Sequence, residues 1–254
     1  MINIKKLHTR FTWKLTLRTL SPLHIGENRE ESSSEIFPLM NVKEYSDAKS
    51  FVIPGSTLRG LFRGYLNEIG LSLKNMNIQP IINDLFGHVD GNGLKGRVWI
   101  GDTKISKSRF TVKHLTPIDR ITHTPIAPLQ VYAIRPGTDM SVNLTLENPN
   151  SYELGLVALF LRALSEEHLA VGSGVSRGMG RVKLLHTETT LLSTQKDKLQ
   201  TEDQVDIPIQ DWQARPTLLG KEYFRSDSGT ESFQWMQAGA TELKNKLMKE
   251  VSSS

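Results

Sequence analysis

The pattern of apolar and polar residues predicts four β-strands, the first of which has one face buried against the rest of the protein. In FTWKLTLRTL, every second residue from Phe11 to Leu17 is apolar and the residues between them are Thr or Lys. MSVNLTLENP repeats this alternation. The predicted strands are residues 11–20, 97–105, 140–149 and 180–190.

Two helices are predicted between these strands. In FVIPGSTLRGLFRGYLNEIG, a short strand and a Pro-Gly turn lead into a helix with Ser56 or Thr57 as N-cap and Gly70 at its end. YELGLVALFLRALSEEHL is the second helix, and the stretch around residues 80–96 is expected to be irregular. The order strand, helix, strand, strand, helix, strand is typical of an α+β, ferredoxin-like fold (split βαβ, RRM-like), an antiparallel sheet with two helices on one face.

Two long insertions interrupt this frame. Residues 106–139 contain four prolines, and apolar residues alternate with polar ones at both ends of the stretch. This pattern predicts a hairpin that protrudes from the domain. Residues 21–50 form a polar loop that is longer than most connections. We expect one ferredoxin-like domain at 1–190 with its hairpin at about 106–139, followed by a C-terminal extension at 191–254 with one helix and a disordered end.

Composition narrows the classes of protein. The chain is 38% hydrophobic and 23% charged, and no apolar run approaches the ~18 residues that a membrane span requires. It contains no cysteine, which excludes disulfides, thiol catalysis and thiolate zinc sites. We therefore expect a cytoplasmic protein with no membrane partner, no metal site and no resident cofactor.

The net charge of +4 is mild, but its distribution is uneven. Residues 95–120 hold seven Lys or Arg against two Asp, which indicates either a solvated cationic face or a surface for a polyanion. The glycine-rich stretch AVGSGVSRGMGRVKL has neither the spacing of a dinucleotide fingerprint nor a G-K-[ST] element. It is either a flexible connector or a loop whose bare amides approach phosphates, with Ser173 and Ser176 as donors and Arg177 and Arg181 as cations.

The start of the first helix adds a second cationic feature. Arg59 and Arg63 are four residues apart and share one helical face, in the turns where free amides and the helix dipole favour an anion. Surface arginines on an amphipathic helix are the alternative. Gly60 and Gly64 weaken this helix by about 1 kcal/mol each relative to alanine, which suggests close approach by another chain or a ligand.

In this order, the segments SPLHIG, FVIPGSTLRGLFRGYL, LFG, TPIDRITH and GSGVSRGMGRV resemble the RAMP superfamily, and in particular the backbone subunit of type III CRISPR effector complexes. The resemblance covers roughly residues 10–187. It implies a ferredoxin-like palm with a thumb hairpin, in a subunit that stacks with other RAMP subunits around a guide CRISPR RNA and its target RNA.

The resemblance also implies roles for single residues. Ser56, Arg59 and Arg63 would hold guide phosphates, the glycine-rich loop would lie against the guide, and the thumb around residues 118–122 would wedge between guide and target bases. The expected RNA-binding residues are Ser56, Thr57, Arg59, Arg63, Ile118, Arg120, Thr122, Gly172, Ser173, Gly174, Ser176, Arg177 and Gly178.

Catalysis is a separate question. Target cleavage in this family depends on an aspartate two residues before a proline, in the loop after the first strand, and here Ile36 precedes Phe37 and Pro38. Isoleucine can neither bind a metal nor orient a water. We expect an RNA-binding subunit without its own cleavage centre, in which His24 packs or caps rather than reacts. The alternatives are a metal-dependent endoribonuclease that acts through Glu35 with Mg²⁺, and a scaffold protein that binds no nucleic acid.

Overall fold

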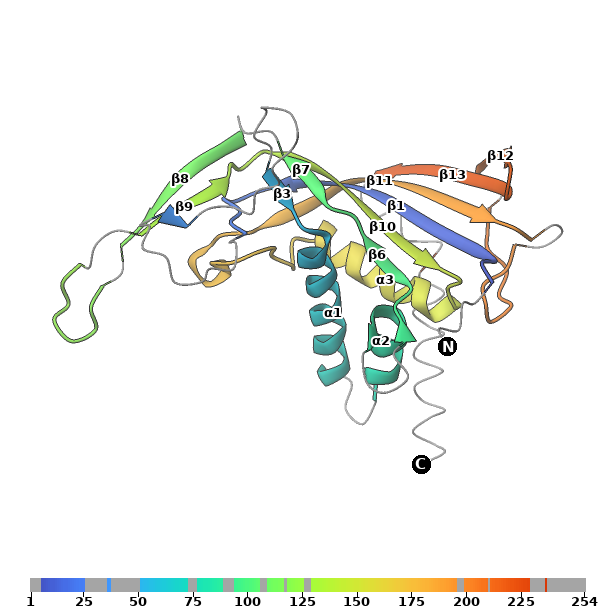
Figure 1. Ribbon diagram of the computed structural model, residues 1–254, viewed down its shortest axis with the longest axis horizontal. Coiled ribbons are helices and arrows are strands. Elements are labelled where there is room, and N and C mark those ends of the chain that lie inside the picture. The colour runs from blue at the N-terminus through green and yellow to red at the C-terminus, as the bar shows by residue number, and fades with distance from the viewer. Residues whose placement is uncertain are drawn as a thin grey trace.

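The computed structural model describes most of the chain. The described residues are 6–25, 36–37, 51–72, 77–88, 94–105, 109–116, 118–125, 129–195, 199–209, 211–228 and 236. Four strands and two helices follow one another in the predicted order and confirm the α+β, ferredoxin-like fold (Figure 1). They are β1 (Thr9–Thr19), α1 (Gly55–Ser72), β6 (Val98–Ile100), β10 (Asp139–Glu147), α3 (Ser151–Ser165) and β11 (Val182–Ser193).

The main sheet has six strands in the order β12-β13-β11-β1-β10-β6, and all neighbours are antiparallel. Its last two strands, β12 (Gln213–Thr217) and β13 (Gly220–Ser228), form a hairpin that the sequence did not reveal. This hairpin extends the sheet beyond β11, so the C-terminal region is part of the palm (Figure 1). The helix expected beyond residue 230 and the expected disordered end lie outside the described residues, apart from Met236.

The helices cover one face of the sheet, which is the lower face in Figure 1. The alternation in β1 turns Phe11 and Trp13 toward these helices, and both side chains are fully buried. Phe62 of α1 stacks on Phe160 of α3 with 4.3 Å between ring centroids. Burial of each such side chain contributes about 1.5–3 kcal/mol, so these aromatic residues help to hold α1 and α3 on the sheet together with the aliphatic core around them.

Helix α1 begins earlier than predicted. It starts at Gly55, and the Gly55 amide donates to Oδ1 of Asp102 at 2.8 Å. The Thr57 amide donates to the Pro54 carbonyl at 2.9 Å, so Ser56 and Thr57 lie inside the first turn. A Cβ at Gly55 would come within 2.0 Å of the Ile100 oxygen. The helix start is thus packed against the turn after β6, and a carboxylate already occupies its first amide.

The stretch between α1 and β6 is not irregular throughout. It contains α2 (Gln79–Phe86) and the short strands β4 (Gly87–His88) and β5 (Leu94–Lys95). Helix α2 buries Ile82, Leu85 and Phe86. The strand predicted at 97–105 is also divided, because β7 (Thr103–Ile105) leaves the main sheet to pair with β3 (Phe51–Ile53). None of the helices in the described part of the chain has the length and apolar character to cross a bilayer.

The predicted hairpin extends away from the palm at the left of Figure 1. It consists of β8 (Phe110–Leu115), β9 (Leu129–Ile134) and, between them, the tip at 118–125, which is closed by a bridge from Ile118 to Pro125. We call this unit the protruding hairpin. The short strand β2 (Ile36–Phe37) pairs with β9 in parallel.

Candidate nucleic-acid interface

The glycine loop, residues 172–180, is tightly built rather than loose. It contains one turn of 3-10 helix, η2 (Val175–Arg177). Gly172 and Gly180 have φ values of +84° and +80°, and added Cβ atoms would lie 2.3 Å from the His24 oxygen and 2.2 Å from the Val171 oxygen. No other residue fits these positions. The loop keeps Ser173, Ser176 and Arg177 exposed, as a loop that receives a ligand requires.

A short segment of the chain, residues 20–25, holds this loop in place, and we call it the linking segment. The Ser173 amide donates to the His24 oxygen, and the Gly180 amide donates to the Pro22 oxygen, both at 2.9 Å. The Arg181 amide donates to Oγ of Ser21 at 2.9 Å. No sequence pattern indicated these contacts, which join residues about 150 positions apart.

The linking segment also contacts the protruding hairpin. Leu23 and Ile134 of β9 exchange two backbone hydrogen bonds, of 3.1 and 2.7 Å. The Nδ1 atom of His24 lies 2.6 Å from the Tyr132 oxygen, and His24 is only 7% exposed. His24 is therefore a packed, hydrogen-bonded residue between the glycine loop and the hairpin.

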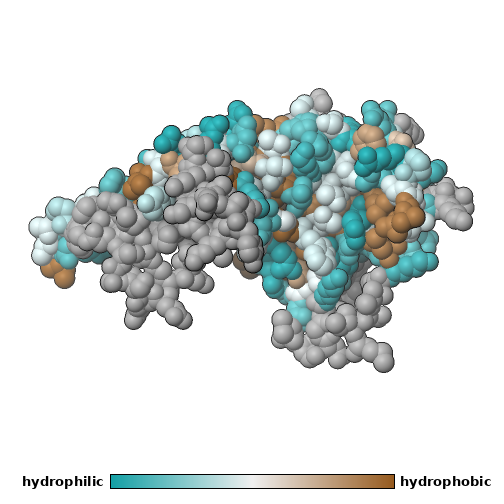
Figure 2. All heavy atoms as spheres, turned by 45° about the horizontal axis from the view of Figure 1, so that its top comes forward, coloured by the Kyte–Doolittle hydropathy of each residue, from teal (hydrophilic) through white to brown (hydrophobic). Residues whose placement is uncertain are grey.

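The tip of the hairpin is organised by Asp119. Its Oδ1 accepts from the Ile121 amide at 2.8 Å and the Thr122 amide at 2.7 Å. These two bonds, that of Thr122 first, hold the pKa of Asp119 below its usual range. Ile118 and Ile121 are 65% and 89% exposed. The end of the hairpin, at the left of Figure 2, shows hydrophobic surface. The tip thus presents two apolar side chains on an ordered loop.

Arg59 is directed into the fold. Its guanidinium donates to the carbonyl oxygens of Phe86 and Val98 and lies 5.4 Å from the Phe86 ring centroid. These partners lie at the end of α2 and in β6, whereas the glycine loop contacts the linking segment. The Arg59 side chain therefore joins α1 to the end of α2 and to β6, whereas the sequence assigned it to guide phosphates.

The exposed side of α1 carries Ser56, Gly60 and Gly64, four residues apart. A Cβ at either glycine would meet no atom within 4 Å. Packing inside the described part of the chain does not explain these two glycines.

Four cations on α1, the protruding hairpin and the glycine loop have no carboxylate partner among the described residues. They are Arg63, Lys113, Arg120 and Arg177. By contrast, Arg181 and Lys183 share Glu167, at 2.8 and 3.1 Å. Arg177 is thus the cation of the glycine loop that is available to an outside anion.

The outer face of the sheet, opposite the helices, is also rich in charge (Figure 2). There each cation of β1 lies beside an acid on a neighbouring strand. The pairs are Arg10 with Glu147 at 2.6 Å, Lys14 with Glu188 at 3.1 Å and Arg18 with Asp139 at 2.6 Å.

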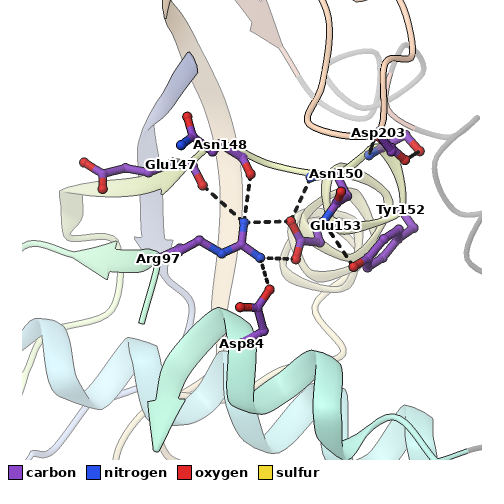
Figure 3. A network of polar contacts seen from close by, with 9 residues as sticks. Asp84, Arg97, Glu147, Asn148, Asn150, Tyr152, Glu153 and Asp203 are labelled. Carbon is purple, nitrogen blue, oxygen red and sulfur yellow. Dashed lines mark hydrogen bonds and ion pairs between the residues drawn. The ribbon is translucent and has the colours of Figure 1, made fainter. Parts of the chain in front are cut away.

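Arg97, which belongs to the basic stretch at 95–120, lies inside the protein (Figure 3). It is 12% exposed and pairs with the fully buried Glu153 and with Asp84. It also donates to the oxygens of Glu147 and Asn148, at 3.2 and 2.9 Å. Burial alone would lower the pKa of Arg97, but hydrogen bonds and charge from Glu153 raise it above its usual value. Arg97 is a structural residue, so the basic stretch is not one continuous surface.

The positions considered for cleavage are only partly described. Glu35 lies outside the described residues, and Ile36 is placed only by the pairing of its backbone with Gln130 of β9. In the part of the chain that the structure describes, no three His, Asp or Glu side chains are grouped so that they could hold a metal ion.

Comparison with known proteins identifies the family. The sequence profile of the RAMP superfamily matches residues 16–183, which is most of the chain. No curated protein sequence matches. Among solved structures, one similar chain comes from the cryo-electron microscopy structure of the type III-B Cmr-beta bound to cognate target RNA, with a TM-score of 0.52 and 16% identity. The alignment covers 72% of this chain and 61% of that one, so it shows a shared fold. This chain belongs to the RAMP superfamily.

Proposed function

We propose that this protein is an RNA-binding backbone subunit of a type III CRISPR effector complex, which holds guide RNA and positions target RNA beside other RAMP subunits in the cytoplasm. The observation that carries the proposal is the pairing of charges. The exposed cations of the glycine loop and the hairpin tip have no carboxylate partner in the described part of the chain, whereas those on the outer sheet face do.

Phosphates are the natural ligands for the glycine loop. Ser173 and Ser176 offer hydroxyl donors, the glycines leave the backbone open to close approach, and Arg177 supplies charge. Lys113 and Arg120 extend this cationic surface along the protruding hairpin. Cations that neutralise phosphates release counterions, which gives affinity without regard to base sequence, as a guide-holding subunit needs.

The hairpin tip suits bases rather than phosphates. Ile118 and Ile121 project from a loop that Asp119 has already ordered, so their insertion costs little conformational entropy. Apolar wedges of this kind unstack neighbouring bases in other nucleic-acid complexes. We assign the tip to the interface between guide and target strands, and we assign α1 a contact through Ser56 and Arg63.

The proposal includes no cleavage centre in this subunit. Ile36 occupies the position at which the family resemblance requires an aspartate, and an alkyl side chain can neither hold a divalent ion nor orient a water. The full chain with Mg²⁺ should therefore leave a labelled RNA intact, and Glu35→Gln should change nothing.

RNA binding by the purified full chain tests the proposal. A fluorescent single-stranded RNA of mixed sequence should bind, and log K should fall linearly with log salt. Arg63→Ala combined with Arg177→Ala should weaken binding equally for unrelated sequences. It should also reduce the salt slope by about 0.7 for each lost phosphate contact on a single strand.

The matched control is Arg10→Ala combined with Arg18→Ala, which removes the same charge from the outer sheet face and should leave the slope unchanged. If both double variants lose affinity and slope equally, binding is governed by overall charge and the proposed interface is wrong. Cleavage of the RNA by the wild-type chain would overturn the absence of a cleavage centre.

A further inference from the structure

The glycine loop and the protruding hairpin both contact the linking segment, residues 20–25. On one side, the linking segment accepts the amides of Ser173 and Gly180 from the loop. On the other side, Leu23 and Ile134 join it to β9 as a short strand. The two segments assigned to RNA are thus attached to one another through the linking segment as well as to the palm.

His24 is the residue at which both attachments meet. Its backbone oxygen accepts from the Ser173 amide at 2.9 Å, and Ser173 Oγ lies 3.4 Å from the same oxygen. Its side-chain Nδ1 lies 2.6 Å from the Tyr132 oxygen, which can only accept, so this nitrogen carries the proton and donates. One buried residue therefore bonds the loop with its main chain and the hairpin with its imidazole.

We infer that His24 is a positioning residue that fixes the protruding hairpin relative to the glycine loop, so that RNA seated on the loop meets the hairpin tip in one register. The part of this inference that concerns RNA rests on the proposed function. The mechanical part does not depend on it, because it concerns the distance between two segments of the chain.

Because the hairpin is long, a small rotation at its base changes the position of its tip. A strand of six residues such as β8 spans about 20 Å, so a swing of about 5° at the base moves the tip by roughly 1.7 Å. A side chain that packs between bases needs carbon contacts of about 3.5–4.0 Å. A displacement of this size removes much of that contact. A hydrogen bond at the base of the hairpin therefore controls how the tip side chains pack between bases.

Spin-label distances in the full chain test the link directly. Because the chain contains no cysteine, Ile121→Cys at the tip and Ser176→Cys in the loop would be the only labelled sites. With His24 intact, a single narrow distance distribution is expected. His24→Leu removes the donor and should broaden the distribution, whereas His24→Asn places an amide N–H near the position of Nδ1 and should keep it narrow.

The matched control is His186→Leu, the same substitution on the outer sheet face, where His186 contacts Ser226. It should leave the distribution narrow. An unchanged distribution in His24→Leu would overturn the inference. If His24→Leu does not fold, amide hydrogen exchange in the wild-type chain tests the link instead. The amides of Ser173, Gly180 and Ile134 should share one protection factor because they open together. Widely different protection factors would contradict the link.

RNA affinity separates this role from a direct contact. His24→Leu should weaken binding of the fluorescent single-stranded RNA by about two- to ten-fold, the range for one lost hydrogen bond, with an unchanged salt slope because no phosphate contact is removed. A reduced slope would show that His24 itself meets the RNA and would contradict the positioning role. If the wild-type chain binds no RNA, the proposed function fails, and the spin-label distances alone decide the link.

Discussion

Two regions of the molecule differ in whether their cations have carboxylate partners. One is the outer face of the sheet, and the other is the end that carries the protruding hairpin and the glycine loop. On the sheet, Arg10, Lys14 and Arg18 each lie within 3.1 Å of a carboxylate on the next strand. At the hairpin end, Arg120 and Arg177 have no such partner in the described residues, and the carboxylate of Asp119 is occupied by backbone amides.

This difference shows why a count of basic residues does not locate a polyanion site. A cation that already has a carboxylate neighbour contributes up to about 1 kcal/mol at the surface and carries little net field. A cation without one offers its full charge to a phosphate and releases a counterion when it binds. The position of acids relative to cations therefore decides which surface can bind RNA.

The largest effect on stability is expected at Arg97, whose buried charge is neutralised by carboxylates. Glu153→Ala leaves the buried Arg97 guanidinium without its main partner, which should lower the free energy of unfolding by about 3–5 kcal/mol in urea denaturation. Asp84→Ala removes a carboxylate that is 45% exposed from the same guanidinium and should cost much less. Equal losses for the two variants would show that burial does not set the strength of this network.

The next largest effect is expected on the order of the hairpin tip, as measured by amide protection. Asp119→Ala removes the acceptor for the Ile121 and Thr122 amides, so both amides should lose protection in hydrogen exchange while the palm stays protected. Asp119→Asn, which keeps an acceptor oxygen, serves as the control.

Acid should have the same effect on the tip. Because the pKa of Asp119 is lowered in the folded protein, its contribution to stability is present above the pKa of an unfolded aspartate and is lost as the pH falls through the lowered value. The tip should therefore stay ordered through the usual titration range of an aspartate and loosen only below it. Loosening at or above that range would contradict the role of the two amides.

A smaller gain is expected from Glu167→Gln. This change releases Arg181 and Lys183 from their shared carboxylate beside the glycine loop. Affinity for single-stranded RNA should rise by roughly two- to five-fold, with a steeper salt slope. Glu166→Gln, which alters the pair with Arg162 on α3, should have no such effect. A fall in affinity with Glu167→Gln would contradict the conclusion that cations without a carboxylate partner bind RNA at this end of the molecule.

The smallest effect belongs to the outer face. Removal of one cross-strand pair by Lys14→Ala with Glu188→Ala should change the free energy of unfolding by less than about 1 kcal/mol and leave RNA affinity unchanged. A clear loss of RNA affinity would place RNA on this face.

The frame of the fold could be predicted because it rests on local patterns. The alternation in β1 and β10 and the apolar run of α3 can each be recognised from neighbouring residues alone. Helix α2 was missed although Ile82, Leu85 and Phe86 have helical spacing, because glycines and charges surround this short segment. The hairpin of β12 and β13 was missed because β12 is largely exposed, β13 is mostly half-buried, and neither strand shows alternation.

The site was harder to predict than the fold because it depends on contacts between distant residues. Sequence spacing correctly put Arg59 and Arg63 on one helix, yet only the fold shows that the Arg59 guanidinium bonds the Phe86 carbonyl. Nothing near Asp102 in the sequence shows that it caps α1, and nothing near His24 shows that it joins the glycine loop to β9.

Amide hydrogen exchange of the full chain with and without single-stranded RNA shows which of the two regions binds RNA, because it reports on both regions in one experiment. RNA should increase protection at the hairpin tip, residues 118–125, and in the glycine loop, residues 172–178, and should leave β1 and β10 unchanged. New protection on β1 and β10 with none at the tip or the loop would contradict it.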